Sequence, residues 1–242
     1  MHNVPAGNLA LSERLRRNYD DYYGGRSEWR ELGAVDKARN IRGLCSAIPH
    51  RRVLEIGAGE GSILQQLNDC GFAETLSALE ISASAVAAIR ERRLASLYGC
   101  RLFDGYSVPY DDASFDLVIL SHVLEHLEHP RQLIYEAARV ATHLFIEVPL
   151  EDTSRQKADF VFDKVGHIND YSARSIRRLL QTCGLQVVAQ RTTNHSLPVY
   201  VYQFGKLGGL ARYVVKGALL RLSPRLASRV YTYNCALLCR RL

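Results

Sequence analysis

The feature that most constrains the fold is a short apolar strand pattern that runs directly into a glycine-rich turn. Residues 53–56 are followed by Gly57, Gly59 and Gly61, and a helical pattern begins after the third glycine. Glycine adopts positive φ without strain and lets a ligand approach the backbone, while the next helix presents its N-terminal amides. The run therefore predicts a strand-turn-helix unit that binds a nucleotide-like ligand.

The position of the third glycine separates two kinds of nucleotide site. Dinucleotide-binding folds use Gly-x-Gly-x-x-Gly at this turn, which would require Gly or Ala at position 62. Residue 62 is serine, and the third glycine comes one position earlier. Glu55, two positions before the first glycine, also suits a site that receives an ammonium group. The spacing disfavours a nicotinamide-dependent oxidoreductase, which is kept as an alternative.

Strand and helix patterns alternate from about residue 51, which indicates βαβ units and a parallel sheet covered by helices on both faces. Seven short apolar segments are predicted strands: 52–56, 76–80, 98–103, 115–120, 143–148, 185–191 and 230–238. Helices are predicted over 61–70, 83–95, 130–141 and 172–183. The last has a serine N-cap at Ser172 and a glycine C-cap at Gly184.

Residues 1–50 are predicted to form N-terminal helices and a lid over a domain that spans 51–242. Helices are expected over 9–19 and 34–47, joined by an aromatic, glycine-containing segment. Four aromatic side chains are candidates for the wall of a substrate pocket, or else pack the helices onto the sheet: Tyr19, Tyr22, Tyr23 and Trp29.

Charge is unevenly distributed along the chain. The formal net charge is +6, but residues 205–242 hold eight basic residues and no acidic one. The rest therefore has 31 − 8 = 23 basic against 25 acidic residues, which disfavours a nucleic-acid-binding body.

The cysteines and the apolar segments set further limits. Six cysteines occur without a Cys-x-x-Cys pair, so neither a metal site nor a disulfide framework is predicted, and buried free thiols are expected. No segment approaches the roughly 20 apolar residues of a membrane span, and the N-terminal residues lack the apolar core of a signal peptide. We therefore expect a cytoplasmic protein. Its oligomeric state is left open.

The glycine turn and the segments after it resemble the motifs of class I S-adenosylmethionine-dependent methyltransferases, in particular the small-molecule, ubiquinone-biosynthesis-like group. Glu55-Ile-Gly-Ala-Gly-Glu-Gly61 resembles the first motif, and Glu80-Ile81 ends the second predicted strand, where the family places an acid on the ribose hydroxyls. Asp104-Gly105 resembles the acid and the backbone that contact adenine.

Two further segments resemble that family in the same order. Residues 108–119 resemble its fourth loop and strand, and residues 121–127, beginning with Ser121-His122, resemble the stretch over the methionine part of the cofactor. The resemblance covers roughly residues 37–191. It implies S-adenosyl-L-methionine as cofactor, S-adenosyl-L-homocysteine as product, and a Rossmann-like, doubly wound seven-stranded sheet in the order 3-2-1-4-5-7-6 with strand 7 antiparallel.

Methyl transfer from a sulfonium requires mainly that donor and acceptor are held in line and shielded from water, with no metal. An oxygen or nitrogen acceptor must also lose a proton. His167 follows the fifth predicted strand, so it is expected at the carboxyl edge of the sheet and is the candidate general base, or else it only orders its loop. His122, His126 and His129 are expected to be structural.

The sequence thus predicts transfer to a small-molecule acceptor, lipid-linked or a secondary metabolite. The alternative is an inactive methyltransferase-like binding or partner subunit. Residues 205–229 are predicted to be a basic helical insertion. It packs on the domain, forms part of the substrate lid, or lies as a peripheral contact on an anionic membrane.

Overall fold

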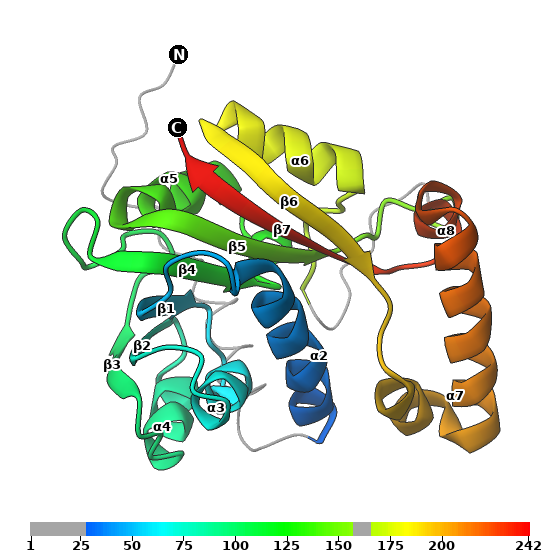
Figure 1. Cartoon of the computed structure of the whole chain (residues 1–242), viewed down its shortest axis with the longest axis horizontal. Coiled ribbons are helices and arrows are strands. Elements are labelled where there is room, and N and C mark those ends of the chain that lie inside the picture. The colour runs from blue at the N-terminus through cyan, green and yellow to red at the C-terminus, as the bar shows by residue number, and fades with distance from the viewer. Residues whose placement is uncertain (1–27, 157–165) are drawn as a thin grey trace.

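The computed structural model describes residues 28–156 and 166–242, and a single mixed sheet lies at the centre of this part of the chain (Figure 1). Its strands are β1 (Arg52–Ile56), β2 (Thr75–Glu80), β3 (Leu97–Leu102), β4 (Phe115–Ser121), β5 (Ala141–Pro149), β6 (Leu185–Thr193) and β7 (Asn234–Arg241). They lie in the order β3-β2-β1-β4-β5-β7-β6. Strand β7 is antiparallel to both β5 and β6, whereas the other pairs are parallel. The predicted topology is confirmed.

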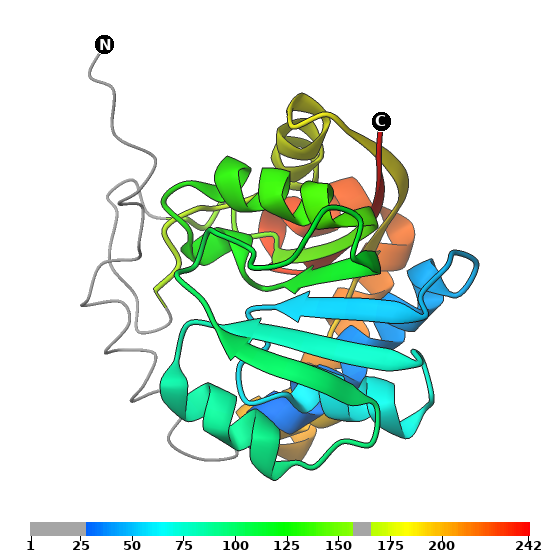
Figure 2. The same cartoon turned by 90° about the vertical axis from the view of Figure 1, so that its left-hand side faces the viewer.

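Helices cover both faces of the sheet, as the alternation of strand and helix patterns predicts. One face carries α2 (Glu28–Cys45), α3 (Ser62–Asp69) and α4 (Ala83–Glu91), and the other carries α5 (Pro130–Val140) and α6 (Ala173–Thr182). Successive strand residues point to opposite faces. Val53 accordingly packs on the face that carries α2, α3 and α4, and Leu54 packs on the face that carries α5 and α6. Both side chains are fully buried. Figure 2 shows β1 and β2 side by side, with their arrowheads at the same edge.

The α2 helix begins six residues earlier than predicted. Trp29 therefore lies in its first turn and not in a loop that joins two helices. Ion pairs to the sheet domain hold this turn: Arg30 pairs with Glu60, and Glu31 lies 2.7 Å from Nη2 of Arg92. Such partners are distant in sequence, so a local pattern does not reveal them. The predicted helix over 9–19 and the lid residues Tyr19, Tyr22 and Tyr23 lie outside the described residues.

The basic insertion is longer than predicted, and β7 starts four residues later. Helix α7 (Leu197–Leu222) and helix α8 (Pro224–Val230) fill the chain between β6 and β7. The helical backbone of α7 is interrupted at Gly205, whose φ of 70° and ψ of 173° produce a kink. The prediction of a strand from residue 230 is wrong because Val230 ends α8, which Ser223 caps by accepting the N–H of Leu226.

Two simpler expectations can also be compared with the structure. All six cysteines are free thiols, five of them buried, whereas Cys70 is exposed. Among the described residues, the helices are all too short or too polar to cross a bilayer.

The glycine turn after β1 generates the first prediction. At Gly57 φ is 72°, and an added Cβ would lie 2.6 Å from Cγ2 of Val123. At Gly71 φ is 61°, but nothing lies within 4 Å of an added Cβ. Gly71→Ala should therefore lower the free energy of unfolding by only the left-handed backbone cost, about 1–2 kcal/mol. Gly57→Ala should cost more, measured by urea unfolding, because the steric overlap adds to that strain.

The double variant Gly57→Ala/Val123→Ala provides the check. Removing the valine methyl groups should recover part of the loss in the Gly57→Ala chain and none in the Gly71→Ala chain. Equal losses at the two glycines would contradict the packing argument.

Candidate functional site

The buried carboxylate of Glu80 links the glycine turn to the end of β2 by hydrogen bonds. Oε2 of Glu80 accepts the N–H of Gly59 at 2.8 Å, and Oε1 accepts those of Ile81 at 2.7 Å and Ser82 at 3.1 Å. Glu80 is only 3% exposed. Hydrogen bonds from backbone N–H groups to an ionised carboxylate are strong, so they fix both the carboxylate and the two strand exits.

A cleft of about 510 Å³, including the part open to solvent, lies at this carboxyl edge of the sheet. Ligands of open α/β sheets bind at such an edge. The residues that line it are Gly57, Glu80, Ile81, Phe103, Gly105, His122, Val123, His126, Leu127 and Leu133. Five of these were predicted from sequence: Gly57, Glu80, Ile81, Gly105 and His122. The other five, Phe103, Val123, His126, Leu127 and Leu133, were not named as site residues. Val123, His126 and Leu127 nevertheless lie in the stretch 121–127 that the resemblance places over the cofactor.

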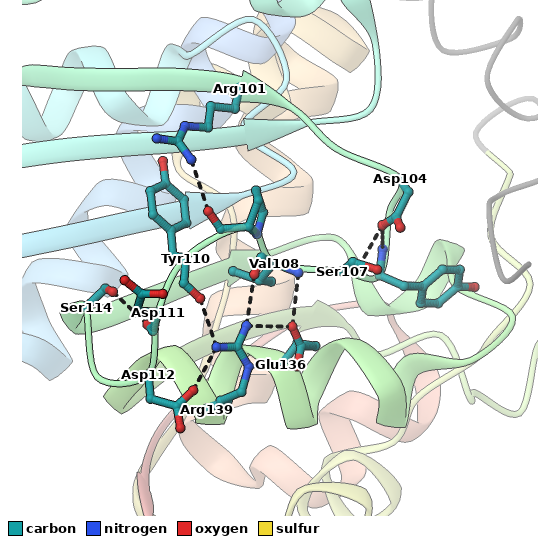
Figure 3. Close-up of polar contacts among 12 residues, drawn as sticks. Arg101, Asp104, Ser107, Val108, Tyr110, Asp111, Asp112, Ser114, Glu136 and Arg139 are labelled. Carbon is teal, nitrogen blue, oxygen red and sulfur yellow. Dashed lines mark hydrogen bonds and ion pairs between the residues drawn. The ribbon is translucent and has the colours of Figure 1, made fainter. Parts of the chain in front are cut away.

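Asp104 stabilises the loop that borders the cleft. Its Oδ1 accepts the N–H of Tyr106 at 2.8 Å and that of Ser107 at 2.6 Å, as Figure 3 shows for this loop. Its neighbours Phe103 and Gly105 line the cleft, whereas Asp104 itself is not among the lining residues. The carboxylate therefore has a structural role at the rim, and its predicted contact with a bound base stays a prediction.

Arg139 of α5 holds the far part of the same loop. Its guanidinium donates to the carbonyl oxygens of Val108 and Tyr110 and pairs with Glu136 and Asp112 (Figure 3). Glu136 in turn accepts the N–H of Val108 at 3.1 Å. The loop between β3 and β4 is thus fixed by side chains that the sequence analysis did not identify.

Glu55, at the fourth position of β1, is a buried carboxyl. It is 1% exposed, and its Oε2 has no hydrogen-bond partner among the described residues. Burial raises its pKa to about 8, with Lys37 of α2 acting in the opposite direction and Glu80 in the same direction. Removal from water favours the neutral form of an acid. Glu55 is therefore a polar group behind the glycine turn whose charge depends on what binds nearby.

His122 lies between two carboxylates that are fully buried. Its Nδ1 is 3.2 Å from Oε1 of Glu125, and its Nε2 is 3.4 Å from Oε1 of Glu147. Burial and Lys37 lower the pKa of His122, but the contacts with the two glutamates outweigh them and the net shift is upward. The pKa of Glu125 is raised by burial, but His122 outweighs this and lowers it to about 2. His122 and Glu125 thus each shift the pKa of the other toward its charged form.

The sequence analysis missed both glutamates, although it predicted Ser121 and His122 for this stretch. Ser121 is buried, and its Oγ has no hydrogen-bond partner among the described residues. Oε2 of Glu147 accepts a hydrogen bond of 2.6 Å from Nδ2 of Asn40, a residue of α2 that lies 107 positions away. No local pattern signals such a partner.

His167 lies beside the cleft and not in its wall. Its Nδ1 is 2.7 Å from Oε2 of Glu151, which follows β5, and its ring centroid is 4.7 Å from that of His126. His126 lines the cleft. A carboxylate on one ring nitrogen of histidine fixes the ring and its tautomer, so the pair has the arrangement of an oriented base.

One group of these side chains could also hold a metal ion. Glu125, His126 and His167 each place one ligand atom within 4.8 Å of the others. Histidine and carboxylate are the usual ligands of several divalent metals. The group lies between the cleft, which His126 lines, and Glu151, which pairs with His167.

Trp29, the predicted lid residue that the structure describes, packs away from the cleft lining. Its ring centroid is 6.2 Å from that of His195 and 6.3 Å from that of Tyr202 in α7. It therefore joins the first turn of α2 to α7, and its place in the wall of a substrate pocket stays a prediction.

Comparisons with known proteins add independent findings. The family of methyltransferase domains matches residues 26–190 of the chain. An uncharacterized protein of Methanocaldococcus jannaschii is 26% identical over 186 residues, and the match covers 72% of this chain and 84% of that protein.

Several solved structures have a similar fold. Geranyl diphosphate C-methyltransferase from Streptomyces coelicolor A3(2), in complex with Mg²⁺, geranyl diphosphate and S-adenosyl-L-homocysteine, has a TM-score of 0.65 and 13% identity, over 98% of this chain and 100% of that one. Coclaurine N-methyltransferase, bound to N-methylheliamine and S-adenosyl-L-homocysteine, has a TM-score of 0.62 and 15% identity, over 86% and 72%. The [4+2]-cyclase SpnF has a TM-score of 0.61 and 19% identity, over 89% and 84%.

Glu55 generates a prediction about pH. Because its folded pKa is about 8 against an ordinary 4.5, its stabilising contribution is complete below pH 4.5 and is lost as the pH rises through 8. Glu55→Gln stays neutral throughout. Between about pH 5 and 8.5 the free energy of unfolding of this variant should therefore rise relative to the wild type, by roughly 2–4 kcal/mol.

Urea unfolding at the two pH values measures this difference. Glu91→Gln, at an exposed carboxyl that ends α4, is the matched control and should show the same difference from the wild type at both. A pH-independent effect of Glu55→Gln would show that the buried carboxyl does not titrate in this range.

Proposed function

The chain belongs to the family of methyltransferase domains, and from that premise we propose that it transfers a methyl group from S-adenosylmethionine to an oxygen or nitrogen atom of a small-molecule acceptor. The observation that carries the proposal is the cleft in which the glycine turn and the fixed carboxylate of Glu80 meet. The proposed reaction requires a cofactor site, a cleft that excludes water and a group that accepts a proton.

The residues present suit the cofactor. Glu80 lines the cleft beside the glycine turn, where its carboxylate, which already accepts three backbone N–H groups, can also accept a hydrogen bond from a sugar hydroxyl. Gly57 lines the cleft, and Val123 packs so closely on it that a side chain at this position is excluded. Ser121 Oγ and Glu55 Oε2 are buried atoms without a hydrogen-bond partner among the described residues, at the side where an ammonium group would be received. When bound, this cofactor supplies an electrophilic methyl group on a sulfonium.

The apolar lining of the cleft supports a transfer step shielded from water. Phe103, Val123, Leu127 and Leu133 face the same space as Glu80. Excluding water strengthens the electrostatic interactions in the site and prevents hydrolysis of a reactive donor. The chain's main tasks are then to orient the acceptor and to remove its proton.

We assign the proton acceptor to His167, oriented by Glu151. If Glu151 accepts the hydrogen bond of Nδ1–H, Nε2 of His167 is the nitrogen that takes the proton. His126, which lines the cleft next to His167, lies where a proton could pass between acceptor and base. An oxygen or nitrogen acceptor that carries a proton requires this step, and the oriented histidine supports such an acceptor.

A second candidate is a methyltransferase-like binding or partner subunit that transfers no methyl group. This candidate is supported by the similar fold of the [4+2]-cyclase SpnF, because one fold can serve unrelated functions. Titration calorimetry with S-adenosylmethionine, followed by a screen for release of S-adenosylhomocysteine with hydroxyl- and amine-bearing metabolites, separates the two. Binding without release across the screen would favour the second candidate, and absence of binding would contradict the proposal.

Glu80→Gln should weaken binding of S-adenosylmethionine by about 10–100-fold, because a charged acceptor of hydrogen bonds is lost. The matched control is Glu74→Gln at the opposite end of β2, where the exposed carboxylate pairs with Arg51 and should not affect the affinity. Thermal melting of both variants distinguishes lost contacts from lost folding. Equal affinities for Glu80→Gln and wild type would contradict the assignment of the ribose contact.

His167→Ala should lower kcat by about 10²–10⁴-fold for an acceptor found in the screen, with the affinity for S-adenosylmethionine unchanged. Glu151→Gln should give a smaller loss, since it removes the orienting carboxylate and keeps the base. If a chelator abolishes the wild-type activity and a divalent cation restores it, the group around His167 is a metal centre and not a proton route.

A further inference from the structure

The second half of α7 and helix α8 carry an apolar surface that the other described residues, 28–156 and 166–242, leave uncovered. Between Tyr202 and Val215 every residue except Gly209 is exposed. The exposed fractions reach 85% at Leu207 and 82% at Leu222, with 56% at Val214. Figure 1 shows α7 and α8 to one side of the sheet, beyond the end of β6.

Five exposed apolar residues lie on one side of the helix after the kink at Gly205, whereas Leu210 and Val215 flank them and Tyr213 projects farther round. Leu207, Ala211, Val214, Ala218 and Leu222 follow one another at intervals of three or four residues, the spacing of a single helical face. None of these five side chains can form a hydrogen bond. They define what we call the outer stripe, to which Leu226 of α8, 57% exposed, adds a further apolar side chain.

The opposite side of α7 is fixed to the domain, so the stripe cannot simply turn inward. Nζ of Lys216 donates to the carbonyl oxygen of Thr232 at 2.8 Å and lies 5.1 Å and 4.8 Å from the ring centroids of Tyr200 and Tyr233. Gly209 packs on the first part of α7 itself, where an added Cβ would be 2.7 Å from the carbonyl oxygen of Tyr200, a buried residue. These contacts hold the outer stripe toward solvent.

Basic residues border the outer stripe on both sides. At 100° per residue, Arg221 projects at one edge of the stripe, whereas Lys206 and Arg212 project about 120° from its centre on either side, Arg212 over the ring of Phe204. Arg225 and Arg229 continue the basic border on α8. No acidic residue occurs from residue 205 to the end of the chain. Among the described residues, no carboxylate forms an ion pair with these five side chains.

We propose that the outer stripe and its basic border bind the surface of an anionic lipid bilayer, with α7 and α8 lying in the plane of the membrane interface. Aliphatic side chains would enter the boundary between headgroups and acyl chains, and the arginines and lysine would lie at the lipid phosphates. The described helices include none able to cross a bilayer, which is consistent with surface binding.

The charges and the chemistry of the stripe favour this occupant over two others. A second copy of the chain would bring two basic borders together without an acidic residue between them, and like charges at an interface oppose association. A protein partner would be expected to form about one hydrogen bond per 100–200 Å² of interface, whereas the stripe offers no side-chain donor or acceptor. The proposal does not depend on methyl transfer.

Co-sedimentation with vesicles tests the proposal on the full chain. Binding to vesicles of phosphatidylcholine with phosphatidylserine should exceed binding to phosphatidylcholine alone by about tenfold or more, and should fall with added salt, because the attraction of the basic border is screened. Equal binding to both kinds of vesicle, or to neither, would overturn the proposal.

Paired variants locate the surface. Val214→Asp in the stripe should lower the partition coefficient on anionic vesicles about tenfold, whereas Val188→Asp on β6, a valine of similar exposure at 54%, should leave it unchanged. Arg221→Glu/Arg225→Glu should lower it similarly, and Arg178→Glu on α6 should have little effect. Losses that are as large in the controls would place the binding surface elsewhere and overturn the proposal.

Light scattering and thermal melting complete the test. The substituted side chains are exposed, so the variants should melt at the same temperature as the wild type. Light scattering should give the same mass for the wild type and for the stripe variant Leu207→Asp. A wild-type oligomer that Leu207→Asp dissociates would instead identify a second copy as the occupant.

Discussion

The cleft at the carboxyl edge of the sheet depends on the buried carboxylate of Glu80, toward which the ends of β1 and β2 converge. Parallel neighbours β1 and β2 end at the same edge, and each contributes backbone N–H groups to the two oxygens of one side chain. A buried N–H group that is left without an acceptor destabilises the folded state. The carboxylate therefore sets the distance between the two turns. On the other side of the glycine turn, Arg92 donates to the carbonyl oxygen of Glu60 at 2.5 Å and so limits movement away from Glu80.

Behind that turn lies an unusual concentration of buried charge. Glu125 and Glu147 have 0% exposed side chains on either side of His122, and Glu55 is buried nearby under the influence of Lys37. Buried charges are stable only when they are paired or bound to a ligand. His122 satisfies this for its two partners, whereas Glu55 remains neutral near pH 7 because burial raises its pKa to about 8. A bound cation near Glu55 would favour its ionised form, which links ligand charge to proton release.

The sequence reveals the sheet and the glycine turn because both follow from short-range patterns. The apolar strands alternate with helices, and the positive φ values of Gly57 and Gly105 require glycine for local reasons. The polar network around His122 could not be predicted in the same way. Asn40 reaches Glu147 across 107 residues, and in sequence Glu125 resembles an ordinary residue of a polar helical turn. The same limit explains the error at the start of α2, whose first turn is stabilised by Arg92, 61 positions from Glu31.

The first turn of α2 lies between the glycine turn at the cleft and helix α7, which carries the outer stripe. Arg30 pairs with Glu60 in the glycine turn, and the adjacent Trp29 lies against Tyr202 in α7. One helical turn thus contacts both the edge of the cleft and the base of the arm formed by α7 and α8. Since α7 is also held by Lys216 and Gly209, a surface bound by the arm would have a defined orientation relative to the cleft. An acceptor dissolved in or carried by that surface would then approach the carboxyl edge of the sheet from a fixed direction.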